Sequence, residues 1–114
     1  MKIKTSELIG AALDWAVAKA DGWSNDGLED IVNGDKYPEH DFSTSWSQGG
    51  PIIDREDIST VREGDAAEWV ASLYDYAASD WYLHTHGPTP LIAAMRCYVA
   101  SKLGDEVEVP EKLL

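Results

Sequence analysis

The segment Thr89–Gly104 constrains the fold of this chain most, because it contains signals for both ends of a helix. Thr89 is a favourable N-cap residue, and Pro90 suits the first helical position, where its missing N–H is not needed. Gly104 is typical of the residue that ends a helix. Between these ends, apolar residues occupy two adjacent helix faces, the first with Leu91, Met95 and Tyr98, the second with Ile92, Val99 and Leu103. We therefore predict a helix over Pro90–Leu103.

A second helix is predicted over Ser6–Ala20. Its apolar residues recur at helical spacing from Leu8 to Ala16, and Gly22 is placed to end it. The two chain ends alternate charged and apolar residues instead. Met1–Lys4 and Asp105–Val109 are therefore predicted to be short edge strands or extended tails.

The segment Ser43–Arg55 has no helical periodicity, and we expect the binding function to be arranged around it. Two glycines and Pro51 favour a loop, and Ile52-Ile53 then favours a short buried strand. In one interpretation the loop offers backbone N–H groups, hydroxyls and the Trp46 ring to a ligand. In the other it is a turn that docks Trp46 into the core. The sequence leaves both open.

The rest of the chain is less strongly patterned. Residues 21–42 are predicted to be loop with one helical turn, and 78–88 irregular and aromatic. From Asp65 to Tyr76 a helix is preferred, with a strand over Glu68–Tyr74 as the alternative. The expected fold is α+β, a small single domain of residues 1–114. Its two main helices would pack on a short antiparallel sheet containing Ile52-Ile53.

Composition excludes several classes of function. The net charge is −12 over 114 residues, which opposes direct nucleic-acid binding, because that requires an excess of Lys and Arg. The negative charge would either keep a small acidic domain soluble or bind a basic protein partner. The sequence has no run of 18 apolar residues and no apolar signal segment, which predicts no membrane span. With one cysteine, Cys97, no disulfide framework exists, and we expect a cytoplasmic protein.

Catalytic and metal-binding motifs are missing from the sequence. It lacks a nucleophile elbow, a phosphate-binding glycine loop and the paired Cys or His-Glu-x-x-His patterns that hold zinc. We therefore predict no catalytic residues, no metal, no cofactor and no enzymatic activity. His84 and His86 would share one face if they lie in a strand, just before a helix N-terminus that favours anions. Arg96 lies within an apolar helix. Its guanidinium would extend into solvent, pair with an acidic side chain or bind an anionic ligand, and the sequence leaves these alternatives open.

Several blocks in order resemble the NinX-type proteins, a family of small proteins of unknown function encoded by tailed phages and prophages of enteric bacteria. These blocks are Lys2–Leu8, Ala12–Ala18, Trp46–Ile53, Pro90–Arg96 and Val99–Gly104. The resemblance implies an accessory phage product made in the bacterial host cell. It implies no activity, catalytic residue or cofactor.

A phage accessory protein without catalytic motifs suggests two classes of function. The first is binding of a small anionic or nucleotide-like ligand, as a sponge that counters host antiviral signalling, in a homo-oligomer. The predicted site residues are Ser45, Trp46, Gln48, Gly49, Gly50 and Arg55 on the loop side and His84, His86 and Arg96 on the helix side. The alternative is an acidic modulator or inhibitor that binds a host or phage protein.

Overall fold

The computed structural model describes residues 1–34, 41–62, 64 and 68–114. Its helices and strands follow in the order β1 (Lys2–Lys4), η1 (Thr5–Glu7), α1 (Gly10–Ala20), α2 (Asn25–Val32), α3 (Trp46–Glu56), β2 (Ser59–Arg62), β3 (Trp69–Asp75), β4 (Asp80–Gly87), α4 (Pro90–Leu103), β5 (Glu106–Glu108) and η3 (Glu111–Leu113). The fold is α+β, as the sequence predicts.

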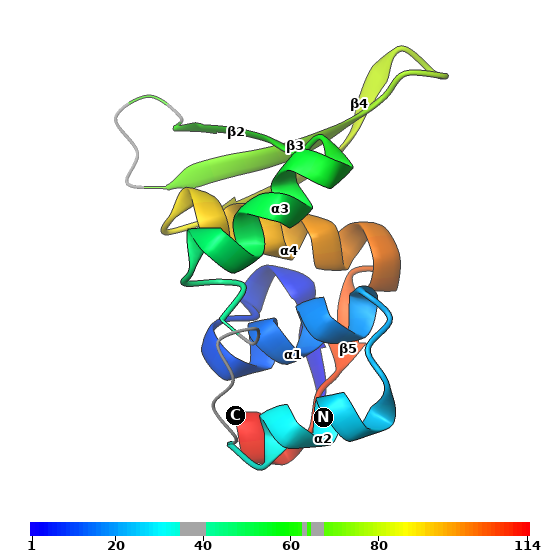
Figure 1. Cartoon of the computed structure of the whole chain (residues 1–114). Helices are drawn as coiled ribbons and strands as arrows, with labels where there is room; N and C mark the ends of the chain where they lie inside the picture. The colour runs from blue at the N-terminus through cyan, green and yellow to red at the C-terminus, as the bar shows by residue number, and fades with distance from the viewer. Residues whose placement is uncertain (35–40, 63, 65–67) are drawn as a thin grey trace.

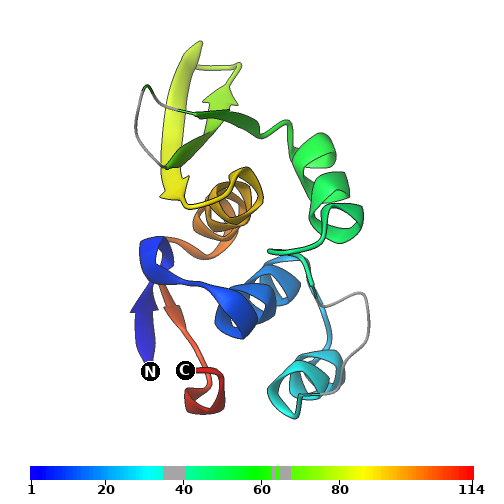
Figure 2. The same cartoon turned by 90° about the vertical axis from the view of Figure 1, so that its left-hand side faces the viewer.

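Helix α4 lies at the centre of the molecule (Figures 1 and 2). On one side it packs against the antiparallel sheet β2-β3-β4, and on the other against α1, with α3 alongside. The sequence predicted that both main helices would pack on the sheet, and that is correct for α4 but wrong for α1. Because α4 is apolar nearly all round, its far side is free to bury α1.

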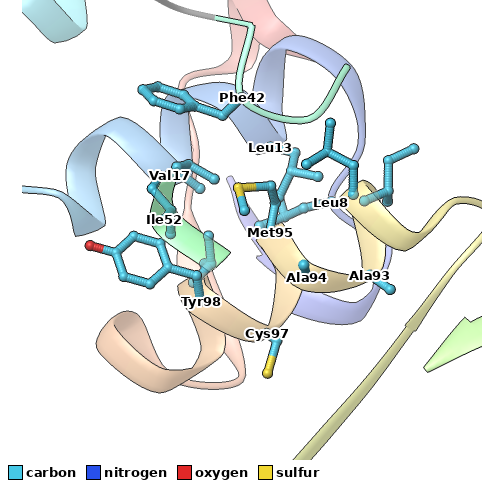
Figure 3. Close-up of a cluster of buried hydrophobic side chains, with 14 of the residues drawn as sticks. Leu8, Leu13, Val17, Phe42, Ile52, Ala93, Ala94, Met95, Cys97 and Tyr98 are labelled. Atoms are coloured by element: carbon cyan, nitrogen blue, oxygen red, sulfur yellow. The ribbon is translucent and has the colours of Figure 1, made fainter. Parts of the chain in front are cut away.

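The core surrounds α4 (Figure 3). Ala93, Ala94, Met95, Cys97 and Val99 of this helix have no exposed surface. Its start and end are as predicted, since Thr89 Oγ1 accepts a hydrogen bond from the Ile92 amide at 3.0 Å and Gly104 follows with φ +90°.

Helix α1 ends as predicted but begins later than the predicted Ser6. Gly22, at φ +85°, closes a Schellman motif in which the Trp23 amide donates to the Ala18 carbonyl. At the other end, Thr5–Glu7 forms a separate 3₁₀ turn. Thr5 ties that turn to the end of α4, because its hydroxyl donates to the Gly104 carbonyl at 2.6 Å.

The chain ends pair as the short strands β1 and β5 (Figure 2), which confirms the sequence prediction. Lys2 lies opposite Glu108, and Lys4 opposite Glu106, so the antiparallel register places opposite charges together. The Met1 ammonium reinforces the pairing with a 2.9 Å hydrogen bond to Glu108.

The predicted loop and strand at Ser43–Arg55 are wrong, because Trp46–Glu56 is helix α3. The buried positions Gly49 and Ile52 are three residues apart on the face toward α4. Gly49 is needed for space and not for an unusual backbone angle. An added Cβ would meet the Phe42 carbonyl oxygen and lie 2.6 Å from Leu91 Cδ1. Pro51 is tolerated on the exposed side of the helix.

The preferred helix from Asp65 to Tyr76 is also wrong, and the alternative strand is correct as β3. Residues 65–67 of that prediction lie outside the described residues. The segment predicted to be irregular contains β4, which pairs with β3, and the single predicted helical turn in 21–42 is the eight-residue α2. Burial between β2 and β4 decides the state of β3, which the local sequence left ambiguous.

Candidate functional site

The nine predicted site residues do not converge on one place. Ser45, Trp46, Gln48, Gly49 and Gly50 lie at the start of α3, whereas Arg55 lies at its end. At a rise of 1.5 Å per residue, nine residues separate the backbones of Trp46 and Arg55 by about 14 Å. His84 and His86 lie on β4, and Arg96 lies on α4.

Arg55 is engaged by neighbouring side chains. Its Nη2 donates to Asp21 Oδ1 at 2.9 Å and to the Tyr98 hydroxyl at 3.2 Å, and its Nε donates to Glu56 Oε2 at 3.0 Å. The hydrogen bond to Glu56 is the main cause that raises the pKa of Arg55. These contacts join the end of α3 to the end of α1 and to the middle of α4.

Arg96 is held by backbone oxygens. Its Nε donates to the Leu8 carbonyl at 2.8 Å, and its Nη1 donates to the His86 carbonyl at 2.9 Å. Burial lowers the pKa of Arg96, with the charge of Glu68 acting in the opposite direction. The side chain therefore links α4 to the segment before α1 and to the edge of β4.

The start of α3 borders a cavity of about 230 Å³ between this helix and the start of α4. It is lined by Ser43, Thr44, Trp46, Thr89, Leu91 and Ile92. The Trp46 side chain is 55% exposed at its margin. The hydroxyls of Ser45 and Ser47 are 2.8 Å apart and bond to each other, while Gln48 Oε1 accepts a hydrogen bond from the Asp41 amide.

Ser43, which the sequence did not single out for a site, is the unusual residue in this cavity. It is 2% exposed, and its amide donates to Asp14 Oδ1 at 2.8 Å. Its hydroxyl oxygen is buried and has no hydrogen-bond partner in the part of the chain that the structure describes. A buried hydroxyl normally has a partner, so this one requires an explanation.

The second candidate region is the outer face of the sheet, the side away from α4 (Figure 1). Ala71 and Leu73 of β3 face the core, so alternation turns the residues between and beside them outward. The register then places these side chains on the outer face: Ser59, Val61, Val70, Ser72, Tyr74, Trp81, His84 and His86. None of the eight is acidic, although the chain has 21 Asp and Glu residues.

Aromatic rings form a row across this outer face. The Tyr74 ring lies 5.1 Å from the Trp81 ring and 4.9 Å from the Tyr76 ring, both edge to face, and Trp81 lies 6.2 Å from His84. A β-bulge accounts for the order, because Leu73 pairs with Leu83 and Tyr74 with Trp81, leaving Tyr82 as the extra residue. Trp81 remains 45% exposed.

The two histidines share this face, as the prediction for a strand required. Nδ1 of His84 is 2.7 Å from the Ser72 hydroxyl, which orients the ring. Nδ1 of His86 is 3.9 Å from Glu68 Oε2. Among the described residues, no group of three or more His, Cys, Asp or Glu side chains is arranged to hold a metal ion.

The sequence analysis missed Tyr74 and Tyr76 as candidates because it favoured a helix there. The period-two pattern Val70, Ser72, Tyr74 was the available signal, since it places three residues on one face of a strand. A third feature, a cavity of about 380 Å³, lies between β4 and η1 and is lined by Lys4, Thr5, Ser6, Leu83, His84, Thr85, Ala100, Asp105 and Glu106.

Fold and surface define this protein as a small acidic α+β domain with an aromatic, carboxylate-free sheet face. Comparison with protein families matches residues 4–102 to the family described as bacteriophage P22, NinX. The chain belongs to this family of bacteriophage proteins, as the sequence resemblance indicated. Comparison with curated proteins gives no significant match. No helix in the described ranges is long and apolar enough to span a bilayer.

Proposed function

We propose that this phage protein is a non-enzymatic accessory protein of the host cytoplasm that binds a small anionic, nucleotide-like ligand on the outer face of its sheet. Binding without turnover would withdraw that ligand from host antiviral signalling, as a sponge does. The single observation that carries the proposal is the exposed Trp81 ring, held by the half-buried Tyr74 ring on a face without carboxylates.

Aromatic rings exposed on a sheet bind planar molecules by stacking. A base stacked on such a ring contributes about 1–3 kcal/mol without requiring a particular sequence or base identity. Tyr74 meets Trp81 edge to face, which fixes the indole while leaving it 45% exposed. This arrangement supports Trp81 as the platform for the planar part of the ligand.

The charge distribution supports the same face for an anion. At a net charge of −12, an anionic molecule is repelled by most of the surface. The eight outer-face positions carry no carboxylate, and two of them are histidines. His84 and His86 offer ring N–H donors to a phosphate close to the Trp81 ring.

Isothermal titration of the purified protein with a panel of nucleoside monophosphates and cyclic nucleotides tests this proposal. Native mass spectrometry of the same sample reads its oligomeric state and any retained ligand. We expect one class of nucleotide to bind and Trp81→Ala to weaken its binding at least tenfold, in line with the stacking energy. Trp46→Ala, at the start of α3, is the matched control, and it should leave unchanged the affinity that Trp81→Ala weakens. Equal binding by Trp81→Ala would refute the assignment.

A protein partner is the second candidate, and the margin of the same face favours it. Asp57, which accepts a hydrogen bond from the Tyr76 hydroxyl, and Glu68, Asp75 and Asp80 surround the aromatic row. An apolar centre with an acidic margin fits a protein with an apolar centre and a basic margin. Pull-down from infected cells at two salt concentrations distinguishes the two candidates. A partner captured in this way must be lost with Trp81→Ala and weakened by salt.

A further inference from the structure

We propose that the outer sheet face selects a nucleotide whose phosphate is a singly charged diester, and that the His84 ring makes this selection through its Nε2–H. Ser72 is the positioning residue that fixes the His84 ring in this form. The assignment rests on the proposed function, because it concerns the phosphate end of a ligand whose base stacks on Trp81. It adds the chemical class of the phosphate and the ring nitrogen that contacts it.

The hydrogen bond between Ser72 and His84 is the first observation. Ser72 Oγ lies 2.7 Å from His84 Nδ1, and Ser72 is only 8% exposed. Within the part of the chain that the structure describes, this is the one hydrogen bond of that hydroxyl. A largely buried hydroxyl proton requires an acceptor, so Ser72 donates and Nδ1 accepts. Nδ1 accepts only when it has no proton of its own, and the neutral His84 ring therefore carries its proton on Nε2.

The direction of this N–H group is the second observation. The two nitrogens of an imidazole point away from each other, so the contact of Nδ1 with Ser72 on β3 turns Nε2–H away from β3. β4 is the edge strand of the described three-stranded sheet, and His84 is exposed there. The centre of the His84 ring lies 6.2 Å from that of the Trp81 ring. One ribose spans this separation between a stacked base and its phosphate.

His86 shares the face with His84 but differs in its contacts. Its Nδ1 is 3.9 Å from Glu68 Oε2, which is beyond hydrogen-bonding distance, so the His86 ring is not fixed in the same way. The carboxylate of Glu68 also repels an anion at this position. His84 is therefore the better placed of the two histidines to hold a phosphate oxygen.

The charges around His84 favour a phosphate with a single negative charge. None of the eight outer-face positions is Lys or Arg, the residues that hold multiply charged phosphates. His84 also lines the cavity of about 380 Å³ between β4 and η1. One cation and two carboxylates line that cavity as well: Lys4, Asp105 and Glu106. These carboxylates repel a doubly charged monoester more than a diester, which has one charge and still offers acceptor oxygens to a neutral N–H.

Calorimetric titration at pH 8 tests the class of ligand. A phosphate monoester is doubly charged at this pH, because its second proton is lost near a pH of about 6. For each common base, the probes are the nucleoside, its 5′-monophosphate, its 3′,5′-cyclic monophosphate and the linear dinucleoside monophosphate. The last two are the two sources of a diester. For the base that binds, we expect at least one diester to bind about tenfold more tightly than the monoester and the nucleoside.

The outcomes separate this assignment from the proposed function. If the 5′-monophosphate binds as tightly as both diesters, and Trp81→Ala weakens that binding, the proposed function stands and the selection of a diester is refuted. Equal binding of the nucleoside refutes the phosphate contact itself. If none of the probes binds, the proposed function fails as well.

The tautomer of His84 can be measured without any ligand. NMR spectra that correlate the ¹⁵N nuclei of histidine rings with their carbon-bound protons distinguish the two neutral forms at pH 8. We expect the Nε2–H form for His84, with some Nδ1–H form appearing in Ser72→Ala. Ser72→Thr keeps a hydroxyl and should restore the preference. The Nδ1–H form as the main form in the unmodified protein overturns the proposal.

Binding by the same variants distinguishes a positioning role of Ser72 from a structural one. Ser72→Ala should weaken diester binding about fivefold and leave nucleoside binding unchanged, because only the phosphate contact is loosened. His84→Ala should abolish the preference for the diester over the nucleoside. Ser101→Ala is the matched control, since its hydroxyl bonds to the Tyr98 carbonyl, and it should change neither affinity. An equal loss for both ligands in Ser72→Ala would make Ser72 a purely structural residue and contradict the proposal.

Discussion

Helices α3 and α4 pack against each other and begin beside the same cavity, but different forces make them helical. α4 has a side-chain cap and Pro at its first position, and it buries eight residues. α3 has no side-chain cap, contains Gly-Gly-Pro, and buries only Gly49 and Ile52. Local sequence specifies α4, whereas contact with the rest of the molecule specifies α3.

The difference has a structural and a functional consequence. A capped helix within the core contributes stability and has no free backbone donors at its start. An uncapped helix at the surface keeps its first amides free for another molecule. The weakness of α3 as an isolated helix is therefore compatible with a binding role at its N-terminus.

Substitutions at the two adjacent glycines of α3 test this comparison with the largest expected change in stability. Gly49→Ala should destabilise the protein by about 3 kcal/mol, because the new methyl group collides with the Phe42 carbonyl and the Leu91 side chain. Urea denaturation followed by circular dichroism measures the change in the free energy of unfolding.

Gly50→Ala is the matched control, since its Cβ would meet only Trp46 Cε3, at 3.8 Å. It should stabilise the protein by about 0.5–1 kcal/mol, the usual gain when Ala replaces Gly in a helix. If both variants have the same effect, close packing of α3 on α4 is not what holds this helix in place.

The arginines of the two helices provide the next test. Arg96→Met should cost about 2 kcal/mol, because the Leu8 and His86 carbonyls both lose a charged donor. Arg55→Met should cost about 0.5 kcal/mol, because a half-exposed ion pair contributes little. The free energies of unfolding of both variants in urea give the comparison. A larger loss for Arg55→Met would make α3, and not α4, the better anchored helix.

How far the sequence predicts this fold depends on where the determining contact lies. Thr89, Pro90 and Gly104 act within α4 itself, so its limits could be predicted. Gly49 and Gly50 look alike in the sequence. Only the packing of Phe42 and Leu91 around one of them shows why a helix forms there, and those contacts are long-range.

The candidate sites show the same division between features set by local sequence and features set by long-range contacts. Trp46, His84 and His86 could be selected by residue type and spacing, and all three border a candidate site. The register between β3 and β4 brings Tyr74 to Trp81, and it depends on a bulge that no local signal indicated. Ser43 could not be selected, because a hydroxyl without a partner is visible only once its surroundings are known.

The helix caps give a smaller effect. Thr89→Ala should destabilise the protein by about 1 kcal/mol, because the Ile92 amide loses its acceptor. Ser45→Ala, at the same position of α3, should change stability by less than about 0.3 kcal/mol, since that side chain caps no amide. Thermal unfolding of the two variants side by side measures both effects. An equal loss for Ser45→Ala would mean that the start of α3 is capped in solution and is not open to a ligand.

The last effect is absent at neutral pH and appears only at high pH. It concerns the ionisation of two buried side chains of α4, Cys97 and Tyr98. Burial raises the pKa of the Cys97 thiol from 9.0 to about 11, although a hydrogen bond with Thr85 acts in the opposite direction. Burial, with the hydrogen bond to Asp21, raises the pKa of Tyr98 from 10.0 to about 12. In both cases the unfolded chain loses its proton first, so stability is retained below pH 9 and declines as pH rises toward 12.

Denaturation in urea at intervals from pH 8 to pH 11.5 should show this decline. Cys97→Ala should delay its onset to about pH 10, where the unfolded-state Tyr98 begins to ionise. Tyr98→Phe should reduce the slope above pH 10, because that variant has lost the buried phenol at position 98. A decline that is identical in all three proteins would place its cause outside α4. The difference between the two helices would then rest on packing and capping alone.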